Sequence, residues 1–358
     1  MSTTTTTTVS KSSTKSSSGP DLAYQYGGNY ARGWVTYLPQ SWLPYIQLTR
    51  LNPPAGLMLV YFPHLFGVLL SSILLQHSLN TLATNILFTL SGSFFLSNAL
   101  HIWDDIIDAP LDKLVSRTKY RPIPRGAVTP FQALIFTITQ TIGAAAFLPY
   151  LPFSLKKNIL YALPGAVGWT YYPFAKRHTN LPQVVLGACM SWGVVMGAVS
   201  SGLEPFHLSI SETGTKSGLF GYDFSYTYHP AFAALFAASS LWTMIYDTIY
   251  AHQDLKDDLE VGIKSLAVLF QNRTKGLLWT LLVLKIAFLV TVGQAAGLGK
   301  VYYAGTVGGS GAALGLMILK VNLKDTESCW WWFGNGFWFA GGSIVAGLVG
   351  EWVESVGF

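Results

Sequence analysis

Long uncharged, largely apolar segments alternate along the chain with short segments that carry the charges. No Asp, Glu, Lys or Arg occurs between Arg50 and Asp104, Arg125 and Lys156, Arg177 and Glu204, or Asp223 and Asp247. About 20 mostly apolar residues are enough for a helix to cross a bilayer. The pattern predicts nine such helices, near residues 54–75, 82–103, 130–150, 157–173, 182–202, 230–250, 276–296, 301–320 and 330–350. The predicted fold class is an all-α polytopic membrane protein, a bundle of nine transmembrane helices.

Composition agrees with this pattern. Charged residues make up 11% of the chain and apolar residues 51%, whereas about a quarter of the residues in a soluble domain are charged. These charges are too few to cover a soluble globule, so the expected surroundings are a lipid bilayer. We expect no nucleic-acid partner, and the sequence indicates no protein partner.

The N-terminal part differs from the rest of the chain. Residues 1–20 have almost no apolar content and are predicted to be disordered. We therefore divide the chain into residues 1–40, a Ser/Thr-rich tail followed by an interfacial segment, and residues 41–358, a single transmembrane domain. The tail has two Lys and no Arg in residues 1–20, which makes a poor mitochondrial presequence. An endomembrane such as the endoplasmic reticulum is favoured over the mitochondrial inner membrane.

Loop charge predicts the orientation. With nine spans, 17 of the 22 basic residues lie on one side, four lie on the other, and Lys285 falls within a span. The side with more Lys and Arg faces the cytosol or its equivalent. Both acidic stretches, residues 104–112 and 247–260, then lie on this basic side.

These two stretches hold nine of the 17 acidic residues. On a helix, Asp104, Asp108 and Asp112 are successive i, i+4 neighbours, and Asp105 lies three residues before Asp108. In the second stretch Asp254 and Asp258 have the same spacing, and Asp247 lies two turns before Asp254. A carboxylate in a transmembrane helix costs roughly 2.5 to 3.5 kcal/mol, so these groups need partners or a function.

Such stacked acids suit Mg²⁺, which binds one or two carboxylates together with substrate phosphates and water. Basic residues follow on the same side of the membrane, and Lys and Arg side chains bind phosphate oxygens. They are Arg117, Lys119, Arg121, Arg125, Lys176, Arg177 and Lys264. Each of them could instead be an ordinary positive-inside loop residue. The acidic stretches could instead be solvated loop residues, but the positive-inside rule does not require aligned Asp residues. We therefore expect a phosphorylated ligand at this site.

Three segments of the chain, in order, carry recognisable motifs. The first runs from Asp104 to Gly126 and resembles NDxxDxxxD followed by RTxxRPxPxG. The second, Tyr171 to Gly187, reads YYPFAKRHTNLPQVVLG. The third, Tyr246 to Ser265, resembles YDxxYAxxDxxDDxxxGIKS. With these motifs the chain resembles the UbiA superfamily of membrane aromatic prenyltransferases, in its 4-hydroxybenzoate polyprenyltransferase-like branch, over roughly residues 45–320.

The resemblance implies a nine-helix bundle of UbiA type with two Mg²⁺ ions that hold an isoprenoid diphosphate. Asp108, Asp112, Asp254 and Asp258 would be the metal ligands, and Asp105 and Asp247 would be neighbouring catalytic residues. The residues that would bind the diphosphate are Arg117, Arg121, Lys176, Arg177 and Lys264. Arg50 would lie near an aromatic acceptor, and a carboxylate on that acceptor would suit it.

Two positions depart from the family pattern. Asp104 stands where the pattern has Asn, which adds a negative charge. Pro110 follows Asp108 and lacks a backbone donor, so it disfavours a helix that continues through Ala109 to Asp112.

The implied activity is Mg²⁺-dependent transfer of a prenyl group, with farnesyl favoured, to the ring of a phenolic aromatic acid. Fungal relatives of this type make meroterpenoids, and a 4-hydroxybenzoate polyprenyltransferase of ubiquinone biosynthesis is the alternative. A divalent-cation transporter could also carry paired Asp residues but would not need the RTxxRPxPxG segment. A CDP-alcohol phosphotransferase would need DGxxAR, which does not follow Asp108. A purely structural membrane protein would leave both motifs unexplained.

Overall fold

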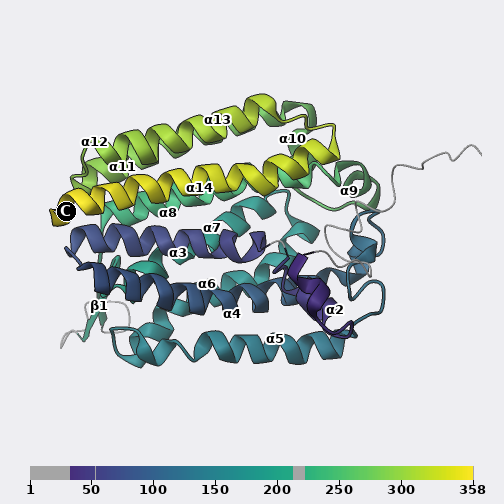
Figure 1. Ribbon diagram of the computed structural model, residues 1–358, viewed down its shortest axis with the longest axis horizontal. Helices are drawn as coiled ribbons and strands as arrows, with labels where there is room; N and C mark the ends of the chain where they lie inside the picture. The colour runs from purple at the N-terminus through teal and green to yellow at the C-terminus, as the bar shows by residue number, and fades with distance from the viewer. Residues whose placement is uncertain (1–32, 53, 213–221, 358) are drawn as a thin grey trace, which may run out of the picture.

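The computed structural model describes residues 33–52, 54–212 and 222–357, and the predicted disordered tail lies outside these residues. Long helices run alongside one another in a bundle (Figure 1). They are α3 (Ala55–Leu74), α4 (Leu79–Asp112), α5 (Pro130–Ala145), α6 (Leu155–His178), α7 (Pro182–Ser200), α8 (Pro230–Ala251), α11 (Thr274–Ala296), α13 (Ser310–Lys320) and α14 (Thr326–Val356).

Shorter elements connect and cap these helices. They are η1 (Gly33–Tyr37), α2 (Leu43–Leu48), η2 (Thr118–Tyr120), η3 (Leu148–Tyr150), α9 (Leu255–Val261), α10 (Leu266–Phe270), η4 (Gln271–Arg273), α12 (Lys300–Tyr302) and the π-helical η5 (Tyr303–Gly309). Elements α2, α9 and α10 lie at one end of the bundle, at the right of Figure 1.

A helix lies at each position where the sequence predicts a span, which confirms the polytopic membrane fold. Within the described residues, eight helical segments are long and apolar enough to cross a membrane. The exception is the fourth predicted span, α6, which contains Pro164 and Pro173 and has charged residues near both ends. The count of nine spans is therefore not confirmed.

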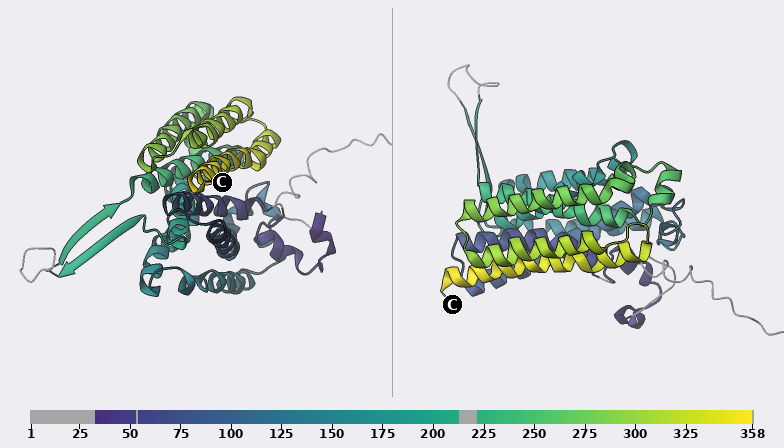
Figure 2. Two further views of the ribbon diagram at one scale, coloured as in Figure 1. Left: turned by 60° about the vertical axis from the view of Figure 1, so that its left-hand side comes forward. Right: turned by 90° about the horizontal axis from the view of Figure 1, so that it is seen from above.

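The described chain also contains a β-hairpin that the all-α prediction missed. Strand β1 (Phe206–Glu212) pairs antiparallel with β2 (Tyr222–Tyr228), with Phe206 opposite Tyr228. The hairpin projects away from the bundle (Figure 2), between α7 and α8 and at the end opposite α9. Residues Phe206 to Glu212 alternate apolar and polar side chains, which is the period of a strand.

The centre of the bundle is formed by α3, α7 and α8. Some 72% of the apolar stretch of α3 and of α7 is buried inside the protein, against 11% for α5. The backbones of α3 and α7 touch, because a Cβ at Gly67 would lie 2.2 Å from the carbonyl oxygen of Val194. A Cβ at Gly197 would likewise lie 2.1 Å from the carbonyl oxygen of His64. Small residues permit this close packing, which fixes the helices that surround the site.

Helix α4 contradicts the expected break at Pro110. The helix continues through Pro110 and ends at Asp112. The proline falls in the last turn, so only the end of the hydrogen-bond ladder loses a donor. Asp105, Asp108 and Asp112 are therefore on one helix, and all three are buried.

Candidate active site

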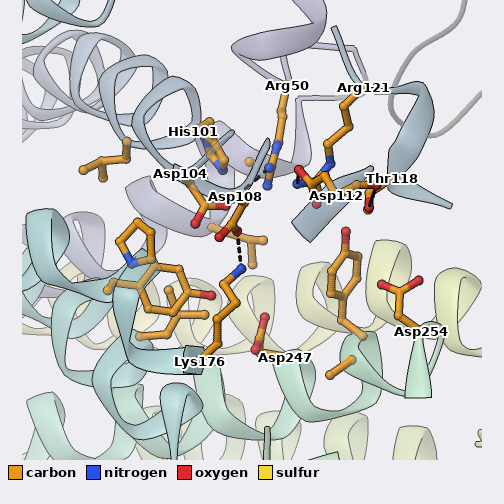
Figure 3. Close-up of a pocket in the computed structure, with 18 of the residues that line it drawn as sticks. Arg50, His101, Asp104, Asp108, Asp112, Thr118, Arg121, Lys176, Asp247 and Asp254 are labelled. Carbon is orange, nitrogen blue, oxygen red and sulfur yellow. Dashed lines mark hydrogen bonds and ion pairs between the residues drawn. The ribbon is translucent and has the colours of Figure 1, made fainter. Parts of the chain in front are cut away.

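A cavity of about 250 Å³ lies at the end of the bundle where α4, α6 and α8 end (Figure 3). Ten of the twelve residues proposed from the sequence line it. They are Arg50, Asp108, Asp112, Arg117, Arg121, Lys176, Asp247, Asp254, Asp258 and Lys264. The two acidic stretches therefore meet, as the loop charges predict.

The first acidic stretch is held by arginines from two loops. Arg121 donates from Nη1 to Asp112 Oδ2 at 2.8 Å and to Asp105 Oδ1 at 3.2 Å. Asp105 is buried and does not line the cavity. Burial alone would lower the pKa of Arg121, but Asp112 and Asp105 raise that pKa well above its ordinary value. Asp105 thus positions the arginine that faces the cavity.

Arg50 reaches the same helix from the loop before α3. Its Nη2 donates to Asp105 Oδ1 at 2.7 Å and lies 3.6 Å from Asp104 Oδ2. Burial would lower the pKa of Arg50, yet Asp105 and Asp104 together raise it above its usual range. Arg50 also has a φ of +52°, a backbone conformation that is uncommon for a residue other than glycine.

The second acidic stretch is divided between two helices, whereas its spacing suggested one. Helix α8 carries Asp247 and ends at Ala251. Asp254 takes the N-cap position of α9, and Asp258 lies one turn further on. The Asp254 side chain makes no capping hydrogen bond to α9; both of its carboxylate oxygens accept hydrogen bonds from Arg117 instead. Burial, and next the neighbouring Asp254, raise the pKa of Asp258 to about 7.

Arg117 connects the two stretches. Its Nε donates to Asp254 Oδ1 at 2.8 Å and its Nη2 to Asp254 Oδ2, so the pair is bidentate. Nη1 donates to the hydroxyl of Tyr250 at 3.0 Å. Arg117 is 4% exposed, and such charge-assisted pairs are stronger than neutral hydrogen bonds. The loop after α4 thus holds the turn between α8 and α9.

Helix α6 supplies a further basic group. Lys176 Nζ donates to Asp108 Oδ2 across the cavity (Figure 3). Arg177 lies outside the cavity wall: it donates to the carbonyl oxygens of Pro173 and Ile107, both at 2.7 Å. Lys264 lines the cavity from the loop after α9 and donates to the carbonyl oxygen of His178 at 3.4 Å.

The chemistry of these carboxylates suits Mg²⁺, although no closed metal site is formed. Among the described residues, no group of three or more His, Cys, Asp or Glu side chains is arranged to hold a metal ion. Asp108, Asp112 and Asp254 are each paired with a basic residue instead. The Oδ1 atom of Asp108 is buried and accepts no hydrogen bond. Carboxylate oxygens are the ligands that Mg²⁺ prefers, so the residues present fit the ion.

Further cavity residues were not singled out as site residues by sequence reasoning. His101 and Tyr172 line the cavity on α4 and α6. Both could have been found by helical spacing, since His101 lies seven residues before Asp108 and Tyr172 four before Lys176. Tyr250 lies under Arg117, whose Cζ is 5.0 Å from the ring centroid. Trp330 and Phe333 come from α14, which no motif covers.

Residues 60–341 match the sequence profile of the UbiA prenyltransferase family. The chain belongs to this family. It is 33% identical to the mitochondrial 4-hydroxybenzoate polyprenyltransferase of Saccharomyces cerevisiae, over 84% of this chain and 74% of the yeast protein. It is 34% identical to the polyprenyl transferase andD of Emericella variicolor, over 82% of this chain and 83% of the relative.

The fold of a solved family member agrees. A UbiA homologue from Archaeoglobus fulgidus, determined with DMAPP and Mg²⁺ bound, aligns with a TM-score of 0.58 at 14% identity. The alignment covers 87% of this chain and 99% of that one. The resemblance seen in the motifs is confirmed, and the enzyme is a multi-pass membrane prenyltransferase of the UbiA family. Membership in this family disfavours a divalent-cation transporter.

Proposed function

We propose that this enzyme transfers a farnesyl group from its diphosphate to the ring of a phenolic aromatic acid, as a step in meroterpenoid biosynthesis. The observation that carries the proposal is the cavity itself, where basic side chains face carboxylates from both acidic stretches. Arg117, Arg121 and Lys176 are held there by Asp254, Asp112 and Asp108. A diphosphate supplies the anionic oxygens that such basic groups bind.

The four proposed metal ligands are Asp108, Asp112, Asp254 and Asp258, and all of them line the cavity. Bound Mg²⁺ would offset the negative charge that develops on the departing diphosphate. Asp105 and Asp247 would orient neighbouring side chains rather than bind Mg²⁺ directly. Arg177 contributes through its bonds to backbone carbonyls beside Asp108, which places its proposed role one step away from the substrate.

In the reaction, the bond between C1 of the prenyl group and the diphosphate oxygen breaks, and the oxygen keeps the electron pair. Arg117, Arg121 and Lys176 stabilise the anion that leaves. The ring carbon of the acceptor bonds to C1, and the ring then loses one proton to the released diphosphate or to water. Tyr246 and Phe333 line the cavity, and these aromatic side chains would stabilise positive charge on the prenyl carbon and keep water away.

The second candidate is a 4-hydroxybenzoate polyprenyltransferase. The observation that favours it is the similarity to the yeast protein of that name. Both candidates use the same diphosphate site, so they differ in the length of the donor and in the acceptor. Placement in an endomembrane stays a prediction, and fractionation of cells that express the full chain tests it.

The decisive experiment uses membranes that contain the full chain. Geranyl, farnesyl and longer polyprenyl diphosphates are incubated with either 4-hydroxybenzoate or an orsellinate-type acid, with and without Mg²⁺. We expect farnesyl transfer to the orsellinate-type acid, and a loss of at least about 100-fold in Asp108→Ala and in Asp254→Ala. Glu354→Ala, an exposed acid on α14, is the matched control that retains activity.

Two results would contradict the proposal. Efficient transfer of long polyprenyl chains to 4-hydroxybenzoate would favour the second candidate. Full turnover in Asp108→Ala or Asp254→Ala, with wild-type amounts of inserted protein, would remove the proposed site altogether.

A further inference from the structure

A second cavity, of about 240 Å³, lies further along the bundle and is lined mostly by apolar side chains. It shares Val60, Trp169 and Met190 with the polar cavity of the active site. Helices α3, α4, α6 and α7 each contribute to both cavities, with the apolar residues further from the acidic end. The two cavities are therefore neighbours along these helices, and the side chains of Val60, Trp169 and Met190 form part of the wall of both.

Helix α4 shows this arrangement most clearly. Leu100, Asp104 and Asp108 line the polar cavity, and Thr89, Ser93 and Leu96 line the apolar one. These six residues are spaced three or four apart, so they form one continuous face of the helix. Gly92 and Phe88 border this face in the apolar cavity.

We infer that the apolar cavity holds the distal part of the donor's isoprenoid tail and that Gly92 marks the depth of its fourth isoprene unit. The inference rests on the proposed function, since it takes the diphosphate to bind among the basic residues. To the proposed function the inference adds the residue of α4 that limits the length of the donor's isoprenoid tail.

The lengths agree with this assignment. At 1.5 Å per helical residue, Leu96 lies about 12 Å, Gly92 about 18 Å and Phe88 about 24 Å from the level of Asp104. An extended polypeptide advances about 3.5 Å over three backbone bonds. The four chain bonds of one isoprene unit therefore cover about 4.6 Å. With C1 level with Asp104, a farnesyl tail ends between Leu96 and Gly92. The fourth unit of a geranylgeranyl tail lies beside Gly92.

Gly92 leaves room that a larger side chain would fill. A Cβ at this position meets only Phe147, at 3.7 Å from Cγ, which is ordinary contact. Phe147 comes from the segment after α5, and its ring lies edge-on to Phe88, with the ring centroids 5.2 Å apart. A leucine at 92 would thus fit the fold while its outer carbons enter the cavity.

The test compares donors of different length. In membranes with the full chain, kcat/KM is measured for geranyl, farnesyl and geranylgeranyl diphosphate with wild type, Gly92→Leu and Gly342→Leu. Gly342 lies on the exposed side of α14, and a Cβ there meets nothing within 4 Å. We expect the geranylgeranyl-to-geranyl ratio to fall at least about tenfold in Gly92→Leu, because one or two added carbons in an apolar pocket discriminate to this extent. Gly342→Leu should leave the ratio unchanged.

A binding measurement separates this inference from the proposed function. Alkylation of a Gly92→Cys variant that also carries Cys189→Ala and Cys329→Ala should slow with geranylgeranyl diphosphate and not with geranyl diphosphate. Absence of prenyl transfer in wild type would refute the proposed function, while length-dependent protection would still support the tail path. An unchanged ratio in Gly92→Leu, an equal loss with all three donors, or protection that does not depend on length would overturn the inference.

Discussion

The first acidic stretch stays within one helix, whereas the second is divided between two. Asp105, Asp108 and Asp112 remain on α4 despite Pro110. In the second stretch, a turn separates Asp247 on α8 from Asp258 on α9. The first stretch therefore forms a single row of acids, whereas in the second stretch the interval of seven residues between Asp247 and Asp254 contains a turn.

The difference lies in what fixes each stretch. The row on α4 is set by helix geometry and is neutralised by Arg121, Arg50 and Lys176. The turn after α8 depends on Arg117, which comes from the loop after α4. The first stretch with its loop thus acts as the scaffold for the second.

Among substitutions that test how the first stretch holds the second, Arg117→Lys is expected to have the largest effect. A lysine cannot form both hydrogen bonds to Asp254, so the turn and the diphosphate site lose their shared contact. We expect prenyl transfer to fall by roughly 10 to 100-fold. The control is Arg125→Lys, because Arg125 does not line the cavity and donates to the carbonyl oxygen of Tyr120 and to the side chain of Gln47 rather than to an acid. Equal losses in both variants would show that Arg117 has no special part in joining the stretches.

A smaller effect is expected for Asp104→Asn, which restores the family's amide. The substitution leaves Arg50 with one neighbouring carboxylate, Asp105, in place of two. Arg50 should then bind a carboxylate on the acceptor more readily. The KM for that acceptor should fall about fivefold, which corresponds to an ion pair that contributes ~1 kcal/mol. An acceptor without a carboxylate serves as the control. If the KM of both acceptors changes alike, Asp104 acts on the site as a whole.

The smallest effect is expected for Pro110→Ala, which tests whether the row on α4 needs its proline. The helix already reaches Asp112, so the added N–H extends an existing ladder. We expect activity within about twofold of wild type, and a free energy of unfolding changed by less than about 1 kcal/mol, because restored helix propensity opposes a more flexible unfolded chain. A loss above tenfold in the same assay would show that Pro110 shapes the site.

Much of this architecture could be predicted from the sequence because both of its main signals are local. Uncharged segments mark helices, and loop charge places Asp108 and Asp254 on one side of the membrane. The turn at His252 to Asp254 was missed, because the seven residues from Asp247 to Asp254 correspond equally well to two turns of an uninterrupted helix. The hairpin was missed because the alternating pattern of two seven-residue strands is short compared with the long apolar spans on either side.

Parts of the site could not be predicted, because they depend on contacts between distant elements. The bond from Lys176 to Asp108 joins α6 to α4, and the pair of Arg117 with Asp254 joins residues 137 positions apart. Asp105 and Arg177 belong to the sequence motifs that predict the site, yet neither residue lines the cavity. Nothing in the local sequence distinguishes them from Asp108 and Lys176, which do.

The length of α4 has a consequence for how reactants and products move. Its 34 residues extend about 51 Å, well beyond the ~30 Å hydrocarbon layer. The acidic end therefore meets water while the apolar face stays in lipid. In the proposed reaction, the released diphosphate departs into the aqueous phase and the prenylated ring remains in the bilayer. Separation of the two products between phases opposes the reverse reaction. Recovery of the prenylated product in the supernatant after centrifugation of the membranes would contradict this separation.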